Sequence, residues 1–136
     1  MILPSSQIAD SILRTVADRL AAEDKIAAAY LLGSGAEGRL REDSDVDIAL
    51  LPVRGASFTG RARLELAADL ASLVGRPVDL GVLHTGNLVY AKEAVAGGRI
   101  IFERDPTARA RFAALTLSMY ADLQENRREV LHAYAA

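Results

Sequence analysis

The chain has 136 residues, and its 16 basic and 18 acidic side chains leave a formal charge of −2. This length is that of one ordinary domain, so we expect a single domain over residues 1–136. No run of Lys or Arg is typical of a nucleic-acid-binding tail, and the absence of cysteine excludes disulfides, thiolate metal sites and cysteine nucleophiles.

The N-terminal sequence, MILPSSQIAD, has neither the basic region nor the long apolar run of a secretory signal. No stretch approaches the length of a membrane span. We therefore expect a cytoplasmic protein with no membrane association and no direct binding of nucleic acid.

The first half of the chain predicts one helix and two strands. Apolar residues recur at helical spacing over residues 6–23, with Ser5 or Ser6 as the cap. Residues 26–32 are almost wholly apolar, as expected of a strand covered on both faces. Residues 33–44 are polar and predict a loop, and residues 46–51 predict a second strand that Pro52 ends.

The second half predicts two helices, two strands and a long final helix. A helix is expected between Thr59 and Gly75, a strand over residues 78–83, a short helix over 87–96 and an edge strand over 99–103. Asp105 is the expected cap of the last helix, with Pro106 as its first residue. The pattern predicts the α/β (α+β) class: a small mixed sheet of about four strands with helices packed on it and a long C-terminal helix.

Apolar residues at helical spacing also predict which sides of the later helices are buried. For the helix between Thr59 and Gly75 they are Leu64, Leu66, Leu70, Leu73 and Val74. For the last helix they are Phe112, Leu115, Met119, Leu123 and Val130. We expect partner binding to use apolar residues of the last helix.

Two carboxylates open the second predicted strand. Side chains on a strand alternate between its faces, so Asp45 and Asp47 project from one side, about 7 Å apart along the chain. Mg²⁺ prefers hard oxygen ligands, so these carboxylates could hold one or two ions together with triphosphate oxygens. A third carboxylate, Asp79, stands beside Asp47 if the second and third strands are neighbours, and would be a metal ligand and the general base.

Gly33 and Ser34 precede this pair by ten residues. A glycine lets the backbone turn sharply, so that N–H groups and the Ser34 hydroxyl face the outer phosphates of a nucleotide. The leaving group would then be pyrophosphate. Each motif alone is weak, since Asp-x-Asp occurs by chance and recurs at Asp43 to Asp45, whereas their combination predicts a nucleotidyl-transfer site.

Other residues that could carry chemistry have simpler interpretations. His84 follows the third predicted strand with no second histidine or cysteine nearby, so we interpret it as a loop residue. His132 is expected on the surface of the last helix. Tyr120 and Tyr134 lie on the same helix, and both packing and partner contact remain open for them.

At these residues the chain resembles the minimal nucleotidyltransferases of the DNA polymerase β-like superfamily, whose signature is Gly-Ser, ten residues and Asp-x-Asp. Within that superfamily it is most similar to the MNT antitoxins that pair with HEPN-domain ribonuclease toxins. The segments RPVDLGVL, AKEAVAGGRIIFERDPTARARF and MYADLQENRREVL fit that group's third Asp, Gly-Arg edge strand and Tyr-x-Asp-bearing last helix.

The resemblance implies a Mg²⁺-dependent enzyme that transfers AMP from ATP to a tyrosine of a HEPN toxin, with which it forms a hetero-oligomer. Asp45, Asp47 and Asp79 match the carboxylates, and Gly33 with Ser34 the nucleotide loop. Two alternatives stay open: steric masking of the toxin by a weak enzyme, and transfer to an aminoglycoside-like small molecule. Masking draws on Gly35 and Glu37, where the family often has a basic or aromatic residue and an arginine.

Overall fold

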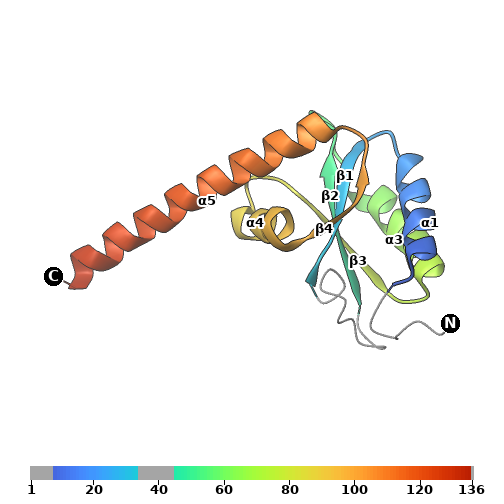
Figure 1. The fold of residues 1–136 in the computed structure, drawn as a ribbon, viewed down its shortest axis with the longest axis horizontal. Helices are drawn as coiled ribbons and strands as arrows, with labels where there is room; N and C mark the ends of the chain where they lie inside the picture. Colours follow the sequence, from blue (N-terminus) through green and yellow to red (C-terminus); the bar gives the residue numbers. More distant parts are fainter. Residues whose placement is uncertain (1–7, 34–44, 136) are drawn as a thin grey trace.

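The computed structural model describes residues 8–33 and 45–135 of the chain (Figure 1). Helices and strands alternate along most of this part. In chain order they are α1 (Asp10–Ala21), β1 (Ile26–Leu31), β2 (Val46–Pro52), α3 (Gly60–Val74), β3 (Val78–Val82), α4 (Leu88–Gly97), β4 (Arg99–Glu103) and α5 (Pro106–Ala135). Every helix and strand predicted for the described residues is present. Most of the observed ends lie within one or two residues of the predicted ends.

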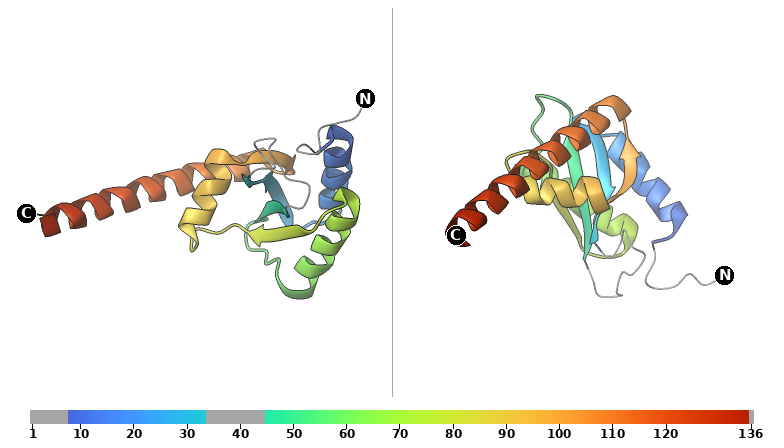
Figure 2. Two further views of the ribbon diagram at one scale, coloured as in Figure 1. Left: turned by 90° about the horizontal axis from the view of Figure 1, so that it is seen from below. Right: turned by 60° about the vertical axis from the view of Figure 1, so that its left-hand side comes forward.

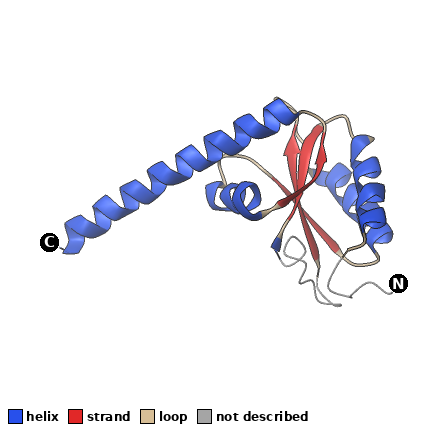
Figure 3. Ribbon diagram, viewed as in Figure 1, coloured by secondary structure: helices blue, strands red, loops and turns tan. Residues whose placement is uncertain are grey.

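The four strands form one sheet in the order β3-β2-β1-β4. β1 pairs antiparallel with β2 and with β4, whereas β2 and β3 run parallel. A parallel pair needs a crossover connection, and α3 supplies it. The sheet is mixed and four-stranded as predicted, with β4 at one edge, and the strands stand between two groups of helices (Figure 3).

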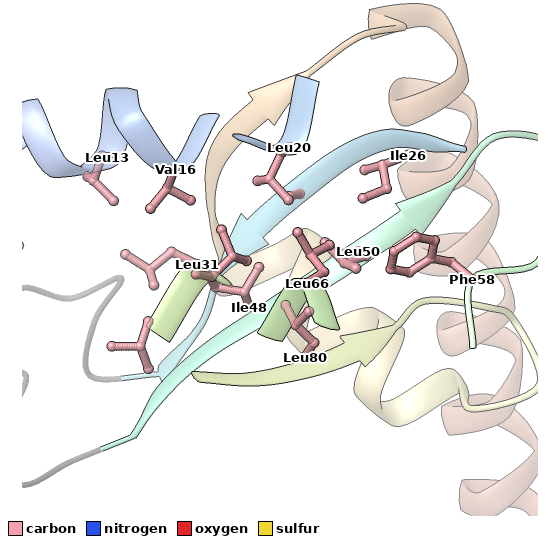
Figure 4. Packing of buried hydrophobic residues seen from close by; sticks show 13 residues of the cluster. Leu13, Val16, Leu20, Ile26, Leu31, Ile48, Leu50, Phe58, Leu66 and Leu80 are labelled. Atoms are coloured by element: carbon pink, nitrogen blue, oxygen red, sulfur yellow. The ribbon is translucent and has the colours of Figure 1, made fainter. Parts of the chain in front are cut away.

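One face of the sheet carries the larger hydrophobic core, against which α1 and α3 pack (Figure 2). Val16 and Leu20 of α1 and Leu66 of α3 are fully buried there against Ile48 and Leu50 of β2 (Figure 4). Because Ile48 and Leu50 are two residues apart, they share this face, and the intervening positions of β2 must face the other side.

The opposite face is built from small side chains and is covered by α4 and the first part of α5 (Figure 2). Ala28 of β1 and Ala49 of β2 are fully buried against Ala91 and Ala94 of α4. Alanines on both sides let a helix approach the strands closely. A register shift between Ile26 and Ala28 in the β1–β2 pairing places Ile26 in the larger core and Ala28 on this second face.

α5 leaves the rest of the molecule after it passes α4 and continues outward to the C-terminal end (Figure 1). Of its described residues only Thr116 is fully buried. Three residues of the predicted buried side are exposed: Leu115, Met119 and Val130. For these three residues the prediction was wrong, because no element of the described residues packs against most of the helix, whereas Phe112 and Leu123 are partly buried. Neither α5 nor another helix of the described residues is long and apolar enough to cross a membrane.

Two further details differ from the sequence-based expectation. α1 begins at Asp10, because Ala9 has an extended backbone (φ −60°, ψ 143°) and Ile8 packs against the core from outside the helix. The predicted cap, Ser5 or Ser6, lies outside the described residues. Leu64 is 67% exposed, since it lies two positions from the buried Leu66 and so points to another side of α3. The cap of α5 was predicted correctly: the Ala108 N–H donates to Asp105 Oδ1 at 3.0 Å.

Arg104 ties the edge strand β4 to the connection between α1 and β1. Its guanidinium donates to the backbone carbonyl oxygens of Ala21 (2.6 Å), Glu23 (3.3 Å) and Ile26 (3.0 Å). These carbonyls belong to the end of α1, the turn after it and the start of β1, and the carbonyl oxygen of Glu23 also accepts from the Ile26 N–H at 3.1 Å. The side chain thus holds three segments together at the end of the sheet where β1 begins.

Candidate active site

Asp45 and Asp47 lie at the beginning of β2. Asp45 directly precedes the strand, and Asp47 is its second residue. Asp47 is exposed, while its neighbours Val46 and Ile48 are buried in the core beneath α1 and α3. The strand therefore directs the Asp47 carboxylate to the opposite face, as the alternation of the sequence predicted.

Asp79 is brought beside Asp47 by the parallel pairing of β2 and β3. In that pairing Asp47 is in register with Asp79, followed by Ile48 with Leu80 and Ala49 with Gly81. Neighbouring strands lie about 4.8 Å apart, so two side chains in register on one face are close neighbours. The prediction that these two carboxylates stand side by side is confirmed.

The pKa of Asp47 is affected by burial and by the neighbouring carboxylates. Burial, followed by the charges of Asp79 and Asp45, raises the pKa of the Asp47 carboxyl above its ordinary value. Each cause acts against the ionised form, by removing water or by repulsion. A cation bound among these carboxylates would remove the repulsion, so the donor set fits a positively charged group.

Gly33 lies at the end of β1, next to the same carboxylate. Its backbone is left-handed, with φ at +61°, a conformation that glycine adopts at little cost. A Cβ placed on Gly33 would lie 3.7 Å from Asp47 Oδ2, and the neighbouring Leu32 N–H donates to the Asp47 carbonyl oxygen at 2.9 Å. The glycine turn and the carboxylates thus meet at one end of the sheet.

The rest of the predicted nucleotide loop lies outside the described residues. This applies to Ser34, and also to Gly35 and Glu37, on which the masking alternative draws. The expectations for these three residues stay predictions.

The carboxylates were also tested as a metal site. Across residues 8–33 and 45–135, no group of three His, Cys, Asp or Glu side chains converges closely enough to hold an ion by itself. Mg²⁺ usually binds through one or two carboxylates and takes its remaining oxygens from water and substrate phosphates. The neighbouring Asp47 and Asp79 fit that mode of binding, in which a nucleotide completes the site.

Tyr90, on α4, is a neighbour of the carboxylates that sequence reasoning did not identify. Burial, then the charges of Asp79 and Asp47, raise the pKa of the Tyr90 hydroxyl to about 12. The positive charge of Arg63 on α3 acts in the opposite direction. Nothing in the local pattern of α4 distinguishes this tyrosine, because its relation to Asp79 depends on how the helix packs on the sheet.

The structure also locates the two histidines and the two tyrosines of α5 that could carry chemistry. His84 is an exposed loop residue beyond the end of β3, whereas Asp79 is the second residue of that strand. His132 is exposed on the outer part of α5, as expected. Tyr120 packs beneath the Lys92 ammonium, 5.1 Å from the ring centre, whereas Tyr134 is 87% exposed.

Comparison with known protein families extends the motif-based resemblance. Residues 14–107 match the family described as "Polymerase beta, Nucleotidyltransferase". The chain is 34% identical over 107 residues to a Shewanella oneidensis protein named protein adenylyltransferase MntA. That match spans 79% of this chain and 75% of the relative.

Solved structures agree with the sequence matches. A structure described as a toxin-antitoxin with AMP-PNP has a TM-score of 0.75 at 30% identity, over 91% of this chain and 98% of the other. A second is described as a tri-AMPylated Shewanella oneidensis HEPN toxin in complex with MNT antitoxin. Its TM-score is 0.70 at 28% identity, over 93% of this chain and 98% of the other.

Proposed function

Because the chain belongs to the polymerase β family of nucleotidyltransferases, we propose that it is an antitoxin and a protein adenylyltransferase. In this proposal a single nucleotidyltransferase domain transfers AMP from ATP to a tyrosine of a HEPN-domain ribonuclease toxin in the cytoplasm. The modification neutralises the toxin. The observation that carries the proposal is the register pairing of Asp47 with Asp79, beside the glycine turn at Gly33.

The chemistry assigns a separate task to each part of the site. The tyrosine oxygen of the toxin attacks the α-phosphorus of ATP, the bond to pyrophosphate breaks, and Asp79 takes the hydroxyl proton. Gly33 and Ser34 present donors to the outer phosphates and so stabilise the departing pyrophosphate. The acceptor is a neutral phenol whose pKa is about 10, so a positioned base is needed to remove its proton during attack.

Asp45, Asp47 and Asp79 would hold Mg²⁺, with two ions expected when ATP is bound. When bound, the ions stabilise the attacking and leaving oxygens of the displacement. The raised pKa of Asp47 supports this assignment, because its causes are burial and then the negative charges of Asp79 and Asp45, and a bound cation would offset those charges.

The surface for the toxin is proposed to include the outer part of α5. Several large apolar side chains are exposed along it: Leu115, Leu117, Val130, Leu131 and Tyr134. Buried apolar contacts supply most of the free energy of association in specific complexes. A helix that extends beyond the sheet and the other helices offers such contacts without obstructing the carboxylates.

Incubation with labelled ATP, Mg²⁺ and the purified toxin tests the proposal. We expect the wild-type protein to label the toxin and the Asp45→Asn/Asp47→Asn variant to give no labelling above background. A matched control, Asp18→Asn/Asp24→Asn, removes the same charge from exposed positions of α1 and the turn after it and should label normally. Equal labelling by the first variant would exclude these carboxylates from the reaction.

The same experiment separates the two alternatives. If the wild-type protein binds the toxin and stops RNA cleavage without labelling it, steric masking is the mechanism. If an aminoglycoside is labelled and the toxin is not, the acceptor is a small molecule. Calorimetry with ATP and Mg²⁺ supplies an independent result, because masking needs no nucleotide.

A further inference from the structure

Tyr90 is seated directly on the backbone of β3. It is the third residue of α4, and its ring lies over Gly81. A Cβ added to Gly81 would lie 1.9 Å from the Tyr90 Oη, 2.6 Å from Cζ and 2.9 Å from Cε2. Real Cβ atoms do not approach other heavy atoms this closely, so the ring occupies space that only a glycine at position 81 leaves open.

This seat places the hydroxyl next to the carboxylate pair. Gly81 lies two residues after Asp79 and shares its face of the sheet, about 7 Å along the strand. Across the sheet, Ala49 and Gly81 form the register pair adjacent in this face to Asp47 and Asp79. Since the hydroxyl lies over Gly81 and the Asp79 side chain projects from the same surface, the two groups are neighbours.

Packing fixes the ring but leaves its hydroxyl available. The ring of Tyr90 packs partly buried against the cluster of Ala49, Ala91 and Ala94 beneath α4. Within the described part of the chain its hydroxyl has no hydrogen-bond partner. A tyrosine placed only to fill this space would need no hydroxyl, because a phenyl ring fills the same volume.

We propose that Tyr90 is a positioning residue for AMP transfer, and that its hydroxyl donates a hydrogen bond to the Asp79 carboxylate when the site is loaded. This inference rests on the proposed function, in which Asp79 is the general base. The bond holds one carboxylate oxygen and so fixes the orientation of the carboxylate towards Mg²⁺ and the acceptor hydroxyl. Neither covalent change nor transfer of the Tyr90 proton is involved.

Tyr90→Phe is the direct test, because it keeps the ring on Gly81 and removes only the hydroxyl. We expect kcat for labelling of the toxin to fall about tenfold, less than loss of the base itself would cost. KM for ATP and for toxin should change less than about twofold, since neither binding surface is altered. Tyr30→Phe is the matched control: it removes a buried tyrosine hydroxyl from the same cluster, on β1 and next to Arg109 of α5, and should leave kcat unchanged.

A double-mutant cycle shows whether Tyr90 acts through Asp79. In an Asp79→Asn background, whose residual rate is set without a base, Tyr90→Phe should have no further effect. Equal fold-losses in both backgrounds would overturn the proposal. Gly81→Ala supplies a second perturbation: it displaces the ring with the hydroxyl still present, and should also lower kcat.

A spectroscopic measurement tests the contact between Tyr90 and Asp79 even if the protein transfers no AMP. The protein is labelled with 3-fluorotyrosine. The ¹⁹F resonance that is missing from the spectrum of Tyr90→Phe is then assigned to Tyr90. Asp79→Asn should shift this resonance, with and without ATP and Mg²⁺, whereas Asp18→Asn should not. No shift would refute the contact, while no toxin labelling by the wild-type protein would refute the proposed function instead.

Discussion

Replacing Asp47 with Asn should make the protein more stable and catalytically inactive. Burial, and then the charges of Asp79 beside it and Asp45 nearby, raise the pKa of the Asp47 carboxyl, which is ionised at neutral pH. Two unit charges about 5 Å apart repel by about 0.8 kcal/mol at the dielectric constant of water. Because Asp47 is exposed, this low value applies, and we expect the free energy of unfolding to rise by about 1 kcal/mol.

Thermal unfolding in EDTA measures this gain. For a chain of this size, about 1 kcal/mol corresponds to a rise in Tm of about 3 °C. Asp18→Asn, at an exposed position of α1, is the matched control and should leave Tm unchanged. With ATP and Mg²⁺ added, the order should reverse, because only the wild-type protein gains stability from the ligands.

The stability difference between Asp47→Asn and the wild-type protein should depend on pH. The folded-state pKa of Asp47 is raised, so its ionised form destabilises the fold at every pH above that value. As pH falls through the folded pKa towards the ordinary value of 3.8, the carboxyl takes up its proton and the destabilisation of the wild-type protein disappears. The difference between variant and wild type should therefore shrink. A variant less stable than the wild type at neutral pH, or a difference that grows in acid, would refute the reasoning.

Three further changes test the framework around the site. Gly33→Ala should cost about 1 kcal/mol in thermal unfolding because of its positive φ, whereas Gly97→Ala, in the helical end of α4, should gain about 0.5 kcal/mol. Arg104→Ala should lower stability in urea by about 2 kcal/mol through loss of three carbonyl contacts, and exposed Arg128→Ala by less than about 0.5 kcal/mol. Removal of residues 127–136 should change Tm by less than about 2 °C yet abolish toxin capture in a pull-down, since the described residues of this segment are exposed; a large drop in Tm would contradict this.

The elements of the fold and two of its carboxylates follow from local patterns in the sequence. Apolar spacing distinguishes helices from strands because a helix repeats about every 3.6 residues and a strand every two. The same alternation places Asp47 opposite Ile48, whatever the strand pairs with. Asp105 likewise caps α5 through a contact three residues along the chain.

Burial of the long helix shows where such reasoning ends. The apolar residues Leu115, Met119 and Val130 have helical spacing but are exposed, because α5 extends beyond the elements that could cover it. Spacing shows that residues share a face of a helix. It does not show that another element packs against that face.

By itself, the sequence determined the strands, the helices and the face on which each strand directs its carboxylates, since these depend on neighbours along the chain. Only the tertiary structure decided that Asp79 stands in register with Asp47, that Gly33 turns beside them and that Tyr90 rests on Gly81. These contacts join residues from β1, β2, β3 and α4, and depend on strand order, register and helix packing. Those are set by burial of the whole core, which no short segment specifies.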